Sequence, residues 1–426
     1  MELRLDRLLA ALRDDTAGML ARIDADPLLT KRTDGDLVLA NASKGLFTPA
    51  EPHQLFAKGV VYRRAPFRLV SLPLVKIFNR GERNVAAADI AALTAEAGHS
   101  GVHFLAKMDG TLIQRFQDGG RVWFTTRGVL EGVRYLGAQD EDAPERLSHF
   151  DFLAETRAVA AGHYPELLDA VPEWDRLTLL FEFLHPATRV VTNYGDRRDL
   201  VLIAAFDRVG FRYLPYRELT ALAAAHGLTG VGEYALHGHT LADRLDDLHA
   251  RLRGTDEEGT VLTVEHGAGI AYRVKVKSAD YLRMLKLMVS CTYPRTAEML
   301  DARPEWTTWE PFEAFLKAQG NESVPEEVLS EYRVHHDTHR AYVRDCERLR
   351  AWAEGEAARI RGTLPDGDER AARKAFAEAV TGHPAKSLLF AAFGGKLTQR
   401  SARDFAPSPA EAAGAVVEMI GGEPPR

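Results

Sequence analysis

Residues 103–111, HFLAKMDGT, carry an apolar run into a single lysine, Lys107, and then into the pair Asp109-Gly110. A second apolar run, Leu112 to Phe116, leads away from it. Asp-Gly between two strand-like segments predicts a tight hairpin. A lysine held at the end of a buried strand is partly desolvated, which frees its amine as a nucleophile. Taken alone, Lys-x-Asp-Gly is more often a solvated lysine before a hairpin, so the rest of the chain must decide between these interpretations.

Length and composition predict a cytoplasmic globular protein of two or three domains. The chain has 426 residues, of which 46 % are hydrophobic and 27 % charged. No segment reaches the ~18 consecutive apolar residues of a membrane span, and the N-terminus lacks the apolar centre of a signal peptide. The two cysteines, Cys291 and Cys346, argue against a disulfide framework and are too few for a four-cysteine zinc site.

The charge distribution leaves a nucleic-acid partner open. The formal net charge is -7, but an acidic protein can still carry a basic groove. Between residues 58 and 83 the local charge is positive instead, because the segment contains seven basic residues and one acid, Glu82. The basic residues are Lys58, Arg63, Arg64, Arg68, Lys76, Arg80 and Arg83. They are interleaved with apolar residues in a strand-like pattern, which predicts a sheet that projects positive charge.

The periodicity of apolar residues predicts an α+β region with antiparallel sheets, 1–280, followed by an all-α region, 281–426. Strand-like segments come in hairpin-like pairs up to Lys277 and do not recur after Ser278. The predicted strands are 37–40, 58–63, 68–77, 102–106, 112–116, 121–126, 177–184, 189–194, 200–206, 259–264 and 270–277. The predicted helices are 1–24, 84–97, 144–170, 216–226, 240–253 and a long one at 325–359.

Four further stretches carry side chains suited to phosphate chemistry. Arg127-Gly128 closes a strand soon after Lys107, and Glu182 lies between two phenylalanines in an apolar strand. Glu258-Gly259 immediately precedes a buried strand. In the final strand Arg273, Lys275 and Lys277 alternate with valines and therefore share one face. Glycine-rich phosphate loops are missing, since Gly394-Gly395-Lys396 lacks the upstream glycine of a P-loop.

In this order the motifs resemble those of the covalent nucleotidyltransferases: Lys-x-Asp-Gly, a basic residue ending a strand, an acid in an aromatic strand, Glu-Gly-x-Val and Lys-x-Lys. Within that superfamily residues 55–285 resemble the ATP-dependent RNA ligases of the bacteriophage type. The segment Leu72 to Asn79, LPLVKIFN, is similar to the Pro-x-x-Lys-Phe-Phe-Asn element of that branch. The helical region after Lys277 also fits, because DNA ligases and capping enzymes typically continue into a strand-rich OB domain. Lys58-Gly59 stands where the family usually has Arg-Gly, which keeps the charge but loses the bidentate fork.

The resemblance implies an α+β adenylation domain, ATP and Mg²⁺ or Mn²⁺ as cofactors, and RNA with 5′-phosphate and 3′-hydroxyl ends as partner. Lys107 would attack the α-phosphate of ATP, and AMP would pass from it to the RNA 5′-phosphate. Lys275 and Lys277 would contact the α-phosphate and favour the neutral amine by like-charge repulsion. Glu258 would hold the metal through water, and Glu182 would accept from ribose hydroxyls. The remaining predicted nucleotide or phosphate contacts are Lys58, Lys76, Asp109, Gly110 and Arg127.

Other interpretations remain open on the sequence alone. Another covalent nucleotidyltransferase, either a DNA ligase or a capping enzyme, would share the same motifs. A non-catalytic RNA-binding relative is a third possibility, and the intact motif set argues against it. His335, His336 and His339 lie on the predicted long helix, where an exposed polar face is expected more than a metal site. The oligomeric state is left undetermined.

Overall fold

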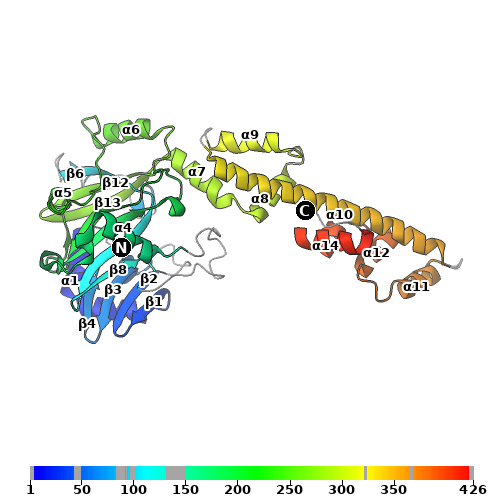
Figure 1. Cartoon of the computed structure of the whole chain (residues 1–426), viewed down its shortest axis with the longest axis horizontal. Coiled ribbons are helices and arrows are strands. Elements are labelled where there is room, and N and C mark those ends of the chain that lie inside the picture. The colour runs from blue at the N-terminus through cyan, green and yellow to red at the C-terminus, as the bar shows by residue number, and fades with distance from the viewer. Residues whose placement is uncertain are drawn as a thin grey trace. The chain divides into compact units, whose positions relative to one another are not determined.

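The computed structural model describes residues 4–42, 49–82, 92, 94–95, 101–130, 150–320, 324–364 and 368–421. The chain divides into two compact units, Met1–Leu285 and Lys286–Arg426 (Figure 1). This division lies five residues after the expected end of the first region at residue 280. The last described strand ends at Lys277, and helix α7 (Ala279–Ser290) runs across the division.

The N-terminal unit contains three β-sheets among its described residues. The first has the order β1 (Leu29–Asp34), β2 (Leu37–Ala42), β3 (Lys58–Arg64), β4 (Phe67–Ser71). The second has the order β11 (Arg212–Tyr213), β10 (Asp199–Asp207), β9 (Leu177–Leu184), β7 (Thr111–Asp118), β8 (Arg121–Thr126). The third has the order β5 (Phe78–Asn79), β13 (Gly269–Lys277), β12 (Gly259–His266), β6 (Val102–Ala106). All described strand pairs are antiparallel except β5 with β13, which confirms the predicted α+β class with antiparallel sheets.

Two strands show how the sequence pattern sets the environment of the site. Strand β9 is almost continuously apolar, because it lies between β10 and β7 with side chains buried on both faces. Strand β13 alternates instead. Val274 and Val276 are buried, whereas Arg273, Lys275 and Lys277 on the opposite face are only partly buried. The alternation predicted for this strand is therefore present.

The predicted hairpin at Lys107 is wrong. Strand β6 pairs with β12, whereas β7 pairs with β8 and β9, so residues 107–110 connect two different sheets. An Asp-Gly turn signal is local and cannot show which strands the flanking segments will pair with. The connection therefore lies between sheets, where side chains from both can converge on it.

Other boundaries also differ from the prediction. The single helix expected at 1–24 is two helices, α1 (Leu5–Asp14) and α2 (Thr16–Ala25), because the Asp15 side chain caps the second by accepting from the backbone N–H of Gly18. The strand expected at 68–77 ends at Ser71, and 189–194 forms no strand. Strand β1 was not predicted, because its only buried residue is Leu29.

The remaining helices of this unit match predicted positions. They are α4 (Phe152–His163), α5 (Tyr216–Ala225) and α6 (Leu241–Leu252). The helix expected at 84–97 falls almost entirely outside the described residues, as do residues 144–149 of the helix expected at 144–170. Arg83 is also outside them.

The C-terminal unit is helical throughout its described residues, as predicted (Figure 1). Helix α10 (Glu326–Gly362) is 37 residues long and contacts each of the other helices that begin in this unit. These are α8 (Tyr293–Ala302), α9 (Trp309–Gln319), α11 (Glu369–Ala379), α12 (Lys386–Phe393), α13 (Gln399–Phe405) and α14 (Pro409–Ile420). No described helix is long and apolar enough to cross a membrane.

The exposed polar face expected for the α10 histidines is wrong for two of the three. His336 and His339 are each only 2 % exposed. The ring of His336 stacks on Phe312, and Nε2 of His339 lies 3.1 Å from a carboxylate oxygen of Asp301. Neighbouring helices cover α10 at this level, which its own sequence pattern could not reveal.

Candidate active site

Strand register brings Lys107, Glu258 and Lys277 together. Ala106, the last residue of β6, lies opposite Thr260 of β12, and the backbone N–H of Lys107 donates to the carbonyl of Gly259 at 2.9 Å. Gly259 in turn lies opposite Lys277 of β13. Its φ is +133°, and a Cβ there would lie 2.2 Å from the Val276 carbonyl oxygen. The glycine of the Glu-Gly motif therefore permits this close approach of strands.

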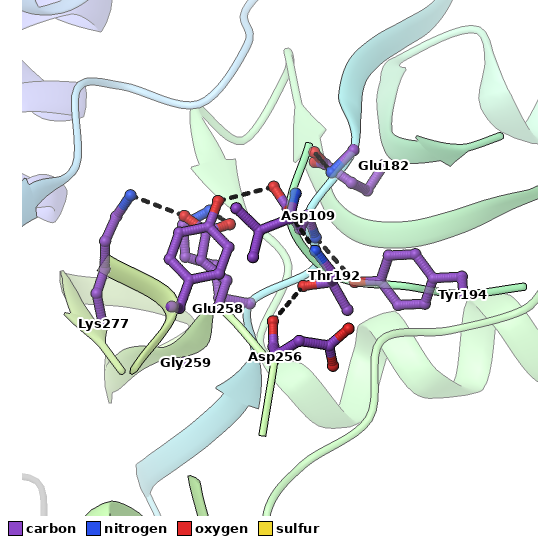
Figure 2. Close-up of polar contacts among 12 residues, drawn as sticks. Asp109, Glu182, Thr192, Tyr194, Asp256, Glu258, Gly259 and Lys277 are labelled. Carbon is purple, nitrogen blue, oxygen red and sulfur yellow. Dashed lines mark hydrogen bonds and ion pairs between the residues drawn. The ribbon is translucent and has the colours of Figure 1, made fainter. Parts of the chain in front are cut away.

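Glu258 lies between two ammonium groups. Its Oε2 contacts Nζ of Lys107. Its Oε1 lies 2.8 Å from Nζ of Lys277 (Figure 2). The Glu258 side chain is only 4 % exposed, and such a buried carboxylate needs charged or hydrogen-bonding partners. Because both oxygens are engaged by lysines, the metal-binding role predicted for Glu258 stays a prediction.

A cavity of about 460 Å³ opens beside Lys107, a size within the range of small-molecule sites. The ten residues predicted for the site are all described, and seven of them line this cavity: Lys58, Lys76, Lys107, Gly110, Arg127, Glu182 and Lys275. The other lining residues are Leu74, Val75, Ile77, Leu105, Ala106, Met108, Leu112, Ile203, Val231, Val261, Thr263 and Arg273. Asp109, Glu258 and Lys277 do not line it. The described lining thus combines six cationic side chains, one carboxylate and a largely apolar remainder.

Burial and, to a smaller extent, neighbouring cations lower the pKa values of two lysines in this cavity. Burial, reinforced by Arg127 and Lys76, lowers the pKa of Lys58 from 10.5 to about 8. Burial also lowers the pKa of Lys275 to about 8, with further repulsion from Lys107 and Lys277. Glu258 opposes the shift at Lys275 only in part, so the cations of the lining outnumber the nearby carboxylates, and a polyphosphate would supply further negative charge.

Phosphate binding is therefore expected to weaken as the pH rises. Lys58 and Lys275 lose their charge above pH 8, so the affinity for tripolyphosphate should fall roughly tenfold between pH 7 and pH 9.5. Calorimetric titration at the two pH values measures this. The variant Lys58→Arg keeps its charge at both and should show a flatter profile. An affinity that stays constant or rises with pH in the wild type contradicts the assignment.

Glu182 is held against Gly110 at the cavity wall. Glu182 lies opposite Leu112 in the pairing of β9 with β7. Its Oε1 accepts from the backbone N–H of Gly110 at 3.1 Å. A Cβ on Gly110 would lie 2.4 Å from the carbonyl oxygen of Phe183, so this approach requires glycine. Burial raises the pKa of Glu182 to about 7. At neutral pH its carboxyl can therefore either accept from or donate to a ligand hydroxyl.

Asp109 organises the connection between the sheets rather than the cavity wall. Its Oδ2 accepts from the backbone N–H groups of Val191 and Thr192 at 2.8 and 3.0 Å. Its Oδ1 accepts from the hydroxyl of Tyr281 at 2.9 Å. Its own N–H donates to the hydroxyl of Tyr194 at 2.9 Å (Figure 2). These bonds fix the residue two positions after Lys107.

Sequence reasoning noted Arg273 on the Lys275 face without assigning it to the site, and it missed the two tyrosines Tyr194 and Tyr281. Arg273 lines the cavity, its guanidinium lies 4.4 Å from the ring of Tyr213, and its buried Nη1 has no hydrogen-bond partner among the described residues. Its position on the same face of β13 as Lys275 was the available signal. Tyr194 and Tyr281 had no such signal, because they reach the site from a loop and from helix α7.

No family model matches the chain. Three solved structures are similar to it at low levels. An archaeal ATP-dependent RNA ligase is 13 % identical over 87 % of this chain and 89 % of that one, with a TM-score of 0.42. A candidate ATP-dependent DNA ligase of Aquifex aeolicus is 13 % identical over 78 % and 80 %, with a TM-score of 0.39. A mutant Naegleria gruberi RNA ligase with ATP and Mn is 15 % identical over 46 % and 55 %, with a TM-score of 0.33. Likenesses of this size do not by themselves define a family.

Proposed function

We propose that this protein is an ATP-dependent RNA ligase that joins 3′-hydroxyl and 5′-phosphate ends through a lysyl–AMP intermediate on Lys107. The observation that carries the proposal is the position of that lysine. Its side chain lines a cationic cavity, and its ammonium contacts a buried glutamate that also pairs with Lys277. The motif order in the sequence supports the same assignment.

In the first step Nζ of Lys107 attacks the α-phosphorus of ATP. A P–N bond forms, the bond from that phosphorus to the bridging oxygen breaks, pyrophosphate leaves, and the amine loses its proton to solvent. Glu258 holds Nζ in place before the attack. The other cations offset the negative charge that builds up on the phosphates, so positioning and electrostatics supply most of the acceleration.

In the second step an oxygen of the RNA 5′-phosphate attacks the phosphorus of lysyl–AMP and releases Lys107. In the third a 3′-hydroxyl attacks the RNA phosphate in that adenylate, forms the phosphodiester and releases AMP. The sequence shows no P-loop with which to phosphorylate ends. We infer that the substrate ends arrive already as 5′-phosphate and 3′-hydroxyl.

The donor set around Lys107 fits a hydrated Mg²⁺ or Mn²⁺ rather than one held directly by several carboxylates. Glu258 is the acid in contact with Lys107, and once Lys107 becomes a phosphoramidate its ion pair with Oε2 is lost. That oxygen could then bind metal-coordinated water, as oxygen ligands suit these ions. A bound ion would neutralise charge on the phosphates.

RNA is favoured over DNA by two features. The LPLVKIFN segment resembles an element of the RNA ligase branch, and its Lys76 lines the cavity. The unit that follows the last strand is helical in its described residues, whereas DNA ligases and capping enzymes typically continue into a strand-rich domain.

Both cysteines are free and buried, which is consistent with a reducing cytoplasm.

The test is to incubate the full chain with α-labelled ATP or GTP and Mg²⁺ or Mn²⁺, and then with RNA or DNA strands bearing 5′-phosphates. We expect a covalent adduct of about 329 Da from ATP and joining of RNA ends. An adduct from GTP alone would make the protein a capping-type enzyme, and joining of DNA alone would make it a DNA ligase. No adduct with either nucleotide would overturn the proposal.

Tyr281→Phe is expected to slow adduct formation on the order of tenfold while leaving the KM for ATP nearly unchanged. The variant removes a hydrogen bond to the buried Asp109 carboxylate and thereby loosens the connection that carries Lys107. Single-turnover labelling at several ATP concentrations separates the two parameters. Tyr342→Phe is the matched control, because it removes a buried hydroxyl that donates to the Ala406 carbonyl in the other unit. Equal rates for both variants would show that Tyr281 has no positioning role.

A further inference from the structure

Three possible metal ligands converge in the C-terminal unit, apart from the cavity beside Lys107. They are Cys291, Glu331 and His335. The cysteine Sγ, a carboxylate oxygen of the glutamate and a ring nitrogen of the histidine all lie within 4.8 Å of one another. The chain thus places a sulfur, an oxygen and a nitrogen donor at one point.

The backbone that carries these side chains is fixed by a small hydrophobic core. Glu331 and His335 are one helical turn apart on α10, so their side chains share a face. Cys291 lies in the connection between α7 and α8 and belongs to the same core as Tyr332. The hydroxyl of Tyr332 donates to the carbonyl of Leu287 at 2.7 Å, which ties α10 to the end of α7. The three ligands therefore come from two segments that are already bound together.

The donor atoms are little used by the protein itself. In the described part of the chain, neither the Glu331 carboxylate nor the His335 ring takes part in a hydrogen bond or ion pair. The described contact of the His335 ring is with Tyr293, at a centroid distance of 6.3 Å. Among the described residues the Cys291 thiol donates to the carbonyl of Val328, at 3.8 Å. Glu331 is exposed, so its side chain can move and the group is open to solvent on that side.

We propose that Cys291, Glu331 and His335 bind a divalent transition metal ion of the Zn²⁺ type, with water as the fourth ligand. On binding, the S–H bond of Cys291 breaks, a sulfur–metal bond forms and the proton passes to solvent. Bond lengths of roughly 2.0–2.3 Å imply ligand separations of about 3.3–3.8 Å in a tetrahedron, so each donor separation contracts by at most about 1.5 Å on binding. A thiolate and an imidazole select against Mg²⁺ and Ca²⁺, which prefer oxygen ligands.

The bound metal would be a structural cross-link between the α7–α8 connection and α10. It is independent of the reaction proposed at Lys107, because none of its ligands lines that cavity. A metal in this position would stabilise the C-terminal unit against unfolding by binding only its folded form.

The test uses the full chain stripped of metal and titrated with Zn²⁺ and, for its spectrum, with Co²⁺. We expect one equivalent to bind, a thiolate-to-cobalt charge-transfer absorption, and a higher melting temperature with Zn²⁺. Cys291→Ser and His335→Ala should each weaken binding at least tenfold and Cys291→Ser should abolish the absorption. Cys346→Ala, which changes the other buried cysteine, is the matched control and should bind as the wild type does.

Two results would overturn the proposal. One is the absence of stoichiometric binding by the wild type, and the other is equal binding by the wild type and both ligand variants, which would mark an adventitious ion only. His335 is partly exposed, so His335→Ala keeps the test valid even if Cys291→Ser fails to fold. Labelling of Lys107 with ATP, measured on the same preparations, reports separately on the proposed ligase reaction.

Discussion

Lys107→Ala is expected to abolish the covalent AMP adduct, with a loss of at least a thousandfold in labelling. The attacking amine is removed, and the neighbouring ammonium of Lys277 is held by its ion pair with Glu258. Intact mass measurement after incubation with ATP and Mg²⁺ detects the adduct directly. Lys107→Arg should be equally inactive, since a guanidinium keeps its charge and is not a nucleophile at neutral pH.

The control for Lys107→Ala is Lys374→Ala, which removes an exposed lysine in the C-terminal unit. Its adduct should match that of the wild type in both yield and rate. Circular dichroism must show that all variants fold, because Lys107→Ala leaves one oxygen of the buried Glu258 without its ammonium partner. A persistent adduct in a folded Lys107→Ala protein would place the nucleophile elsewhere.

Lys275→Met is expected to change activity and stability in opposite directions. Adduct formation should fall by a hundredfold or more, because a cation beside the reacting phosphate is lost. The free energy of unfolding at pH 7 should rise by about 1–3 kcal/mol. The reason is that the folded-state pKa of Lys275, about 8, lies below its ordinary value of 10.5, so folding imposes a cost on its charge.

The pH dependence gives that stability prediction a definite sign. The cost is present in full below pH 8 and disappears as the pH passes 10.5, where Lys275 is neutral in both states. Denaturation of the wild type and Lys275→Met at pH 7 and pH 10.5 should therefore show a gap that closes at the higher pH. Lys275→Arg keeps the charge and should gain no stability at pH 7. A Met variant less stable than the wild type at pH 7 would show that Lys275 is a stabilising residue.

Much of the fold could be predicted because its signals are local. Strand β13 shows a period-two alternation and β9 a continuous apolar run. Both patterns depend only on residues that are adjacent in the chain. The change from strands to helices after Lys277 is equally local. For the same reason the motifs that line the cavity could be recognised from residue type and order, with Lys107, Glu182 and Lys275 among them.

The errors and omissions around the candidate site occur where pairing partners are distant in the chain. Asp109-Gly110 was interpreted as a hairpin, although the flanking strands join different sheets. The stretch 189–194 was interpreted as a strand, although it is the loop whose backbone N–H groups bind Asp109. Tyr281 and the clustering of Cys291 with Glu331 and His335 depend on helix packing, which no short-range pattern encodes.

The sequence by itself determined which side chains can perform phosphate chemistry, because their types and order are fixed by the chain. The tertiary structure alone decided what each of them contacts. Strand register places Glu258 between Lys107 and Lys277. The nucleophile Lys107 is therefore held by a buried carboxylate, in addition to the repulsion from neighbouring lysines that the sequence predicted. Register depends on pairing energies between distant segments, and for that reason it is read from the folded protein and not from the local sequence.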